Sequence, residues 1–138
     1  MIKLNPYLNF NGTAEKAIQL YQRALGAKVE AIMRFGDVKD MPSSPETKDK
    51  IMHAMLQIGE GILMISDCAP GQPVQLGNHV TVTLHFDDVA DMAKKFDAMA
   101  VGGSVQQPLQ DMFWGARFGM LTDAYGIPWM FNCETKKT

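Results

Sequence analysis

The chain has 138 residues, 46% of them hydrophobic and 20% charged, which is the size and composition of one globular domain. Its net charge is −2 and its Lys and Arg residues form no run, which argues against a nucleic-acid-binding surface. No apolar run approaches the roughly 20 residues that cross a bilayer. The first residues, MIKLNPYLNF, lack a signal-peptide pattern, so we expect a cytoplasmic protein without a membrane partner.

The first half of the chain predicts a strand, a helix and three further strands. Period-2 alternation and the i, i+3, i+4 apolar spacing predict, in order, strand 4–10, helix 14–25, strand 27–35, strand 51–58 and strand 62–67. Thr13 is the predicted helix N-cap, and Gly26 ends the helix. The polar, proline-containing segment 36–49 predicts a mobile loop.

The second half repeats this order after a Gly- and Pro-containing loop over 68–78. The predicted elements are strand 79–87, helix 89–101, strand 105–109, a strand around 118–121 and strand 127–132. The turn Asp123–Gly126 joins the last two strands, because Gly126 accepts positive φ at little cost.

The two halves also match in sequence. Adding 76 to a position aligns Leu8 with Leu84 and Gly26 with Gly102. Adding 65 in the third and fourth strands aligns Met55–Leu56 with Met120–Leu121 and Gly61–Ile62 with Gly126–Ile127. We therefore predict an α+β fold in which residues 1–138 form a single domain of two βαβββ modules, about 1–75 and 76–138. The modules should form a curved, cup-like antiparallel or mixed sheet with the helices on its outer face.

A tandem βαβββ repeat of this size resembles the vicinal oxygen chelate superfamily, which contains glyoxalase I, ring-cleaving dioxygenases and the fosfomycin and bleomycin resistance proteins. Three segments resemble its PhnB-like subgroup: PYLNFNGTAEKAIQLYQRALGAKV at 6–29, MISD at 64–67, and DMFWG, FG and TDAYGIPWMFN within 111–132. That subgroup often carries a domain name taken from 3-demethylubiquinone methyltransferases. The chain has no Gly-rich strand-to-helix turn for S-adenosylmethionine, so methyltransferase activity is not expected.

The resemblance also implies where a metal would bind. Metal-dependent members place His or Glu on the first and fourth strands of each half, facing the concave sheet. The internal repeat maps these places near Asn5, Ile65, Thr81 and Met130. None of these side chains is a carboxylate or an imidazole, so we expect neither a metal nor another cofactor.

The chain has more aromatic residues than two thin sheets need for packing against each other. The excess predicts an apolar pocket with a few polar groups, although core packing also explains these residues. The candidate pocket residues are Tyr7, Asn9, His53, Asp67, Trp114, Phe118, Met130 and Asn132. Alternation along 127–132 puts Met130 and Asn132 on the pocket face, and Trp129 and Phe131 under the helix. His53 and Asp67 are the candidate catalytic groups, but a structural histidine and a turn-forming aspartate are the more common roles of such residues.

Three hypotheses for function remain open at this stage. The leading one is metal-independent binding of a small apolar or aromatic molecule in the concave face. The second is a glyoxalase- or dioxygenase-like enzyme with a divergent site, using His53, Asp67 and Asn132. The third is a structural dimer with a vestigial pocket. A homodimer is expected in each case, because open sheets expose edge strands that a partner commonly covers.

Overall fold

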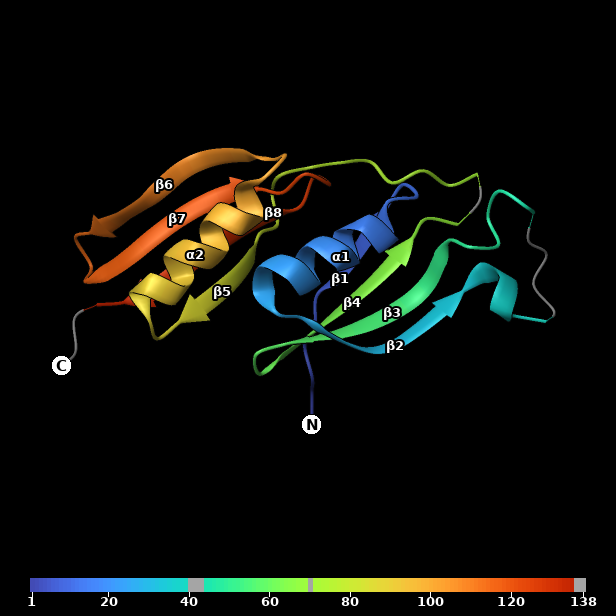
Figure 1. The fold of residues 1–138 in the computed structure, drawn as a ribbon, viewed down its shortest axis with the longest axis horizontal. Coiled ribbons are helices and arrows are strands. Elements are labelled where there is room, and N and C mark those ends of the chain that lie inside the picture. Colours follow the sequence, from blue (N-terminus) through green and yellow to red (C-terminus); the bar gives the residue numbers. More distant parts are fainter. Residues whose placement is uncertain (40–43, 70, 136–138) are drawn as a thin grey trace. The chain divides into compact units, whose positions relative to one another are not determined.

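A computed structural model describes residues 1–39, 44–69 and 71–135, and the chain divides into two compact units, Met1–Gln75 (unit 1) and Leu76–Thr138 (unit 2). Each unit contains one helix and one four-stranded mixed sheet (Figure 1). The predicted α+β class with two βαβββ modules is confirmed. The cup-like arrangement of the modules and the homodimer remain predictions.

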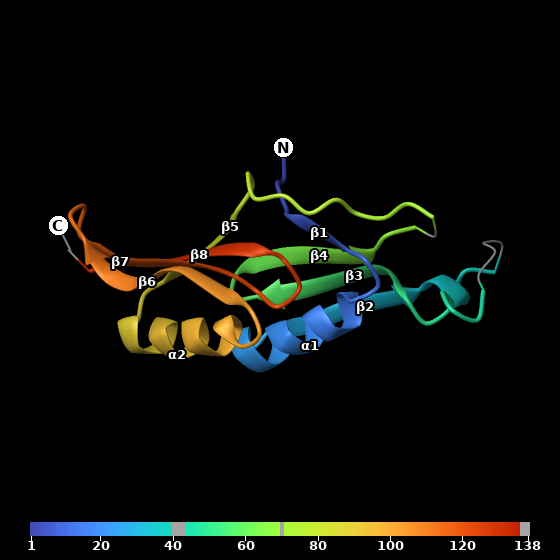
Figure 2. The same ribbon diagram turned by 90° about the horizontal axis from the view of Figure 1, so that it is seen from above.

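Unit 1 follows the predicted element order. Its elements are β1 (Tyr7–Phe10), α1 (Ala14–Leu25), β2 (Lys28–Arg34), the 3-10 helix η1 (Phe35–Asp37), β3 (Ile51–Ile58) and β4 (Gly61–Asp67). The strand order is β1-β4-β3-β2, with β1 parallel to β4 and the other neighbours antiparallel. Helix α1 lies along one face of this sheet (Figure 2). The opposite side is called the unit 1 open face below.

The core of unit 1 lies between α1 and its sheet. The apolar residues predicted for one helix face are all buried, namely Ala14, Ala17, Ile18, Tyr21 and Leu25. Phe10, Leu56 and Ile65 of the sheet are at most 2% exposed. Burial of this area removes apolar surface from water, which is the main term that stabilises such a module.

Unit 2 repeats the same topology. Its elements are β5 (Val82–Phe86), α2 (Val89–Ala100), β6 (Ser104–Met112), β7 (Ala116–Thr122) and β8 (Pro128–Glu134). The strand order is β5-β8-β7-β6. Phe96 of α2 meets Phe131 of β8 edge to face at 5.0 Å, and Trp129 and Phe131 are at most 1% exposed. The prediction that these two aromatic residues pack under the helix is confirmed, and the opposite side is the unit 2 open face.

Several strand limits differ from the predicted ones. The first strand begins at Tyr7 rather than at residue 4, and the fifth begins at Val82 rather than at 79. Strand β6 is longer than the predicted 105–109, because Pro108 lies on an edge strand where a missing N–H donor is tolerated. Thr13 is the N-cap residue of α1, as predicted, but its side chain makes no capping hydrogen bond.

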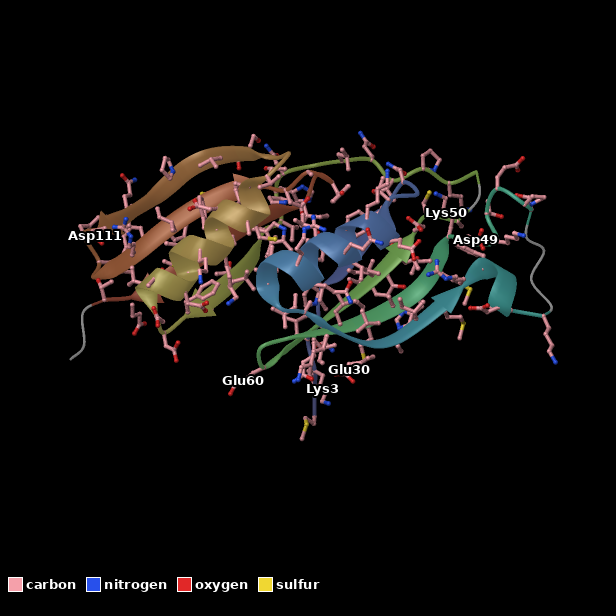
Figure 3. The ribbon with its side chains drawn as sticks, in the orientation of Figure 1. Lys3, Glu30, Asp49, Lys50, Glu60 and Asp111 are labelled. Atoms are coloured by element: carbon pink, nitrogen blue, oxygen red, sulfur yellow. The ribbon has the colours of Figure 1, made fainter. Side chains whose placement is uncertain are left out.

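The predicted loop over 36–49 lies in part outside the described residues, which omit 40–43. Its two flanks are joined, because the Gly36 N–H donates to the Lys48 carbonyl oxygen at 2.9 Å. Asp49 and Lys50 lead into β3 (Figure 3).

Arg34 ties the end of β2 to its neighbours. Its Nη2 lies 2.5 Å from Glu15 Oε2, and its Nη1 donates to the Asp49 carbonyl oxygen at 2.6 Å. The hydrogen bond to Glu15 is the main cause that raises the pKa of Arg34 above its ordinary value. The guanidinium therefore keeps its charge at every pH at which the protein is handled.

Neither of the two helices in the described part of the chain is long and apolar enough to cross a membrane.

Candidate functional site

The unit 1 open face is built by strand register. Residues directly opposite each other in neighbouring strands share a face of the sheet. Tyr7 pairs with Met64, Met64 with Met55, and Met33 with His53. The side chains of this face are therefore Tyr7 and Asn9 of β1, Met64 and Ser66 of β4, His53 and Met55 of β3, and Ala31 and Met33 of β2.

Tyr7 and His53 meet on this face although they come from strands that are not neighbours. The Tyr7 hydroxyl lies 3.3 Å from His53 Nδ1, and the two ring centroids are 5.9 Å apart. His53 sits on a central strand, as predicted, and is half-buried. Because Tyr7 engages Nδ1, the ring orientation is restricted and Nε2 is the nitrogen that remains for a ligand.

Asp67 belongs to the fold rather than to this face. Its Oδ1 accepts from the Ala14 N–H and its Oδ2 accepts from the Ile51 N–H, each at 2.9 Å, and the residue is 4% exposed. The carboxylate thus caps α1 in place of Thr13 and also anchors the start of β3. Both oxygens hold backbone donors, so we leave Asp67 out of the proposed binding surface.

The unit 2 open face has the same plan. The register places on it Thr83 and His85 of β5, Met130 and Asn132 of β8, Phe118 and Met120 of β7, and Gln107 and Gln110 of β6. Met120 and Met130 pair directly, as Met55 and Met64 do in unit 1. His85 is exposed, and its Nδ1 lies 3.5 Å from Asn132 Nδ2.

An aromatic series leads from the β6–β7 turn to this face. Phe113 and Trp114 occupy the centre of the turn, which closes when the Gly115 N–H donates to the Met112 carbonyl oxygen at 3.2 Å. Phe113 is 96% exposed and Trp114 is 50% exposed. Trp114 meets Phe113 at 5.0 Å and Phe118 at 5.9 Å, both edge to face. Turn centres normally carry small or polar residues, so two aromatic residues here form an unusual exposed apolar surface.

The pocket prediction named Trp114 and Phe118 but not Phe113. The signal was present in the sequence as the FWG triplet, because a glycine after two aromatic residues suits a turn that presents both rings.

Comparison with known proteins agrees with this architecture. Residues 3–131 match the Glyoxalase/Bleomycin resistance protein/Dioxygenase superfamily. The chain belongs to this superfamily. It is 33% identical to Protein YjdN of Escherichia coli K12, over 94% of this chain and 93% of YjdN.

Two solved structures are similar to this chain over nearly its whole length. Protein PA1353 of Pseudomonas aeruginosa is 43% identical, with a TM-score of 0.88 over 99% of this chain and 100% of that protein. A Bacillus cereus PhnB protein, described as a putative 3-demethylubiquinone-9 3-methyltransferase, has a TM-score of 0.79 at 20% identity, over 96% of this chain and 99% of that one. The predicted PhnB-like resemblance is confirmed.

The strand register corrects the metal-site mapping for this superfamily member. Leu8 pairs with Ile65 and Leu84 pairs with Phe131, so the fourth strands align at an offset of 66 rather than 65. Ile65 is therefore the counterpart of Phe131, and it is fully buried on the helix side. The counterpart of Met130 on the open face is Met64.

The side chains at the corrected positions are poor ligands for zinc, nickel or iron. The fourth-strand positions are Met64 and Met130, and the predicted first-strand positions, Asn5 and Thr81, lie just before β1 and β5. None of these side chains is a carboxylate or an imidazole, which zinc, nickel or iron requires. Within either unit, the described residues hold no cluster of three His, Cys, Asp or Glu side chains. These residues therefore support no reaction step at such a metal.

A separate hollow of about 310 Å³ opens beside the end of β4, and of the predicted pocket residues it contains only Asp67. The polar groups on its wall already serve the fold. The Asn11 amide exchanges two hydrogen bonds with the Val74 backbone, at 2.9 and 2.6 Å, and Lys50 Nζ donates to the Gly12 carbonyl oxygen at 2.9 Å. The open faces are therefore the better candidate site.

Proposed function

We propose that this protein binds a small apolar or aromatic molecule on the open faces of its sheets, without a metal. The observation that carries the proposal is the composition of the unit 2 open face. Phe118, Met120 and Met130 form an apolar strip on it, and His85 and Asn132 stand beside the strip. Small-molecule sites have this composition, because apolar contacts supply affinity and a few polar groups set orientation.

Methionine supports a broad ligand range on these faces. Each open face carries a directly paired set of two methionines, Met55 with Met64 and Met120 with Met130. The thioether side chain is flexible and polarizable, so it adapts to ligands of different outline and contacts aromatic rings favourably. The exposed ring of Trp114 offers a stacking surface at the edge of the unit 2 face.

A second candidate function is supported by the contact between Tyr7 and His53. A tyrosine hydroxyl 3.3 Å from an imidazole nitrogen can orient the imidazole as a general acid or base. A divergent enzyme of this kind is expected to lose turnover in His53→Ala while its ligand affinity stays within about threefold of the wild type. The binding-only proposal predicts no turnover with either protein.

The binding proposal predicts a specific response to charge on the open face. We expect Met130→Glu to weaken binding of the apolar fluorophore N-phenyl-1-naphthylamine at least tenfold, about 1.4 kcal/mol, since a carboxylate resists burial against an aromatic ring. Fluorescence titration measures the dissociation constant. Val101→Glu is the control, because it adds the same charge at a position that is 69% exposed at the end of α2. Equal affinity of the two variants, or no binding by the wild type, would contradict the proposal.

A further inference from the structure

Unit 1 gathers four soft donor side chains on its open face. Met33 pairs with His53 across β2 and β3, and Met55 pairs with Met64 across β3 and β4. His53 and Met55 are two residues apart on β3, so all four side chains rise from the same face. The set contains three thioethers and one imidazole, and it differs from the first- and fourth-strand positions at which metal-dependent superfamily members bind their metal.

Three of these side chains, His53, Met55 and Met64, are within reach of one common point. Directly opposed residues have Cβ atoms about 4.5–5.5 Å apart, and diagonal neighbours about 7–8 Å. Met64 is directly opposite Met55 and is the diagonal neighbour of His53, whereas Met33 lies on β2, two strands away from Met64. Methionine has three rotatable bonds, so its sulfur can turn toward a point above β3.

His53 is already oriented for such a role. The Tyr7 hydroxyl oxygen is 3.3 Å from His53 Nδ1 and can accept a hydrogen bond from the Nδ1–H when Nε2 binds an ion. Metal-binding histidines usually donate their second ring N–H to an oxygen in this way, which fixes the ring and the tautomer. Tyr7 is thus a positioning residue for His53.

We propose that the unit 1 open face binds one copper(I) ion through His53, Met55 and Met64. Thioether and imidazole ligands are neutral and soft, and they favour copper(I) over harder divalent ions. The inference does not rest on the proposed function, since it needs the sulfur atoms rather than an apolar surface.

Unit 2 provides an internal control within the same chain. It keeps the methionine pair as Met120 and Met130. Phe118 occupies the place of His53, and Gln110, which pairs with Phe118, occupies the place of Met33. Two thioethers without the imidazole should not hold the ion, so binding is expected on unit 1 alone.

The test uses silver(I), which has the same preference for soft ligands and does not change oxidation state during the titration. The full chain carries Cys68→Ser, because the half-buried Cys68 thiol would bind the same ion, whereas Cys133 is buried. Methionine methyl groups labelled with ¹³C are followed by NMR. We expect one equivalent of silver(I) to shift the methyl signals of Met55 and Met64 and to leave those of Met120 and Met130 in place.

Met55→Leu combined with Met64→Leu removes two of the three proposed ligands. Leucine keeps the volume and the apolar character but has no sulfur, so the variant should keep the far-ultraviolet circular dichroism spectrum of the wild type. Silver(I) affinity should fall at least tenfold in the same protein. The inference is overturned if silver(I) affinity is unchanged in this variant, if the Met120 and Met130 signals shift instead, or if no signal shifts.

Discussion

Asp67→Ala is expected to lower the free energy of unfolding of unit 1 by about 2–5 kcal/mol. The substitution removes the acceptor of two buried backbone donors, the Ala14 and Ile51 N–H groups. A buried donor left without a partner costs about 1–3 kcal/mol. Because one donor starts α1 and the other starts β3, both elements should lose their anchor together.

Urea unfolding followed by far-ultraviolet circular dichroism measures this effect, since both tryptophans, Trp114 and Trp129, lie in unit 2 and do not report directly on unit 1. Asp67→Asn should fall between the wild type and alanine, because its amide retains one acceptor oxygen. Asp97→Ala on the exposed side of α2 is the control. A loss below about 0.5 kcal/mol in Asp67→Ala, the range of ordinary surface substitutions, would contradict the assigned role.

Gly103→Ala is expected to destabilise unit 2 by about 2–4 kcal/mol, because added atoms in a closely packed place force the backbone to move. A Cβ atom on Gly103 would lie 2.2 Å from the Thr122 carbonyl oxygen and 2.9 Å from the Asp123 carbonyl carbon. Both are backbone atoms that cannot turn aside as a flexible side chain can. The Trp129 Nε1–H donates a hydrogen bond to Asp123 Oδ2 at 2.9 Å. Trp129 fluorescence therefore reports directly on this region during urea unfolding.

Gly61→Ala is the control for this substitution. The nearest atom to its added Cβ is the Ile58 carbonyl oxygen at 3.5 Å, an ordinary contact. The internal repeat shows that only unit 2 needs a glycine at the Gly103 position, since the counterpart of Gly103 in unit 1 is Ala27. There the β3–β4 turn contains only Gly59 and Glu60, whereas the β7–β8 turn is longer. Equal stability of Gly103→Ala and Gly61→Ala would show that the longer turn does not press on Gly103.

Much of the fold could be predicted because periodicity and an internal repeat are local signals that agree with each other. The errors arose where distant contacts decide. Thr13 has the residue type of an N-cap, but the capping acceptor is Asp67, 53 residues away in sequence. Counted between equivalent positions, the β7–β8 turn has one residue more than the β3–β4 turn, so the last strand is shifted by one position. A shift of one position exchanges the two faces of a strand. Ile65 was therefore assigned to the wrong face.

The candidate site could be predicted only in part, for a similar reason. Alternation in β8 separated Met130 and Asn132 from Trp129 and Phe131 correctly. Cross-strand neighbours such as Tyr7 and His53 depend on register, which the sequence of one strand does not contain. The predicted pocket residues therefore stay a proposal that binding experiments decide.

Binding of N-phenyl-1-naphthylamine by protein that has been treated with EDTA and dialysed tests the central claim most directly. The account predicts saturable binding with the same dissociation constant before and after removal of metal, and weaker binding by Met130→Glu, because apolar contacts on the open face supply the affinity. Loss of binding after EDTA treatment, with recovery on addition of zinc, nickel or iron, would contradict the account. A metal-assisted site would then have to replace the apolar face as the basis of function.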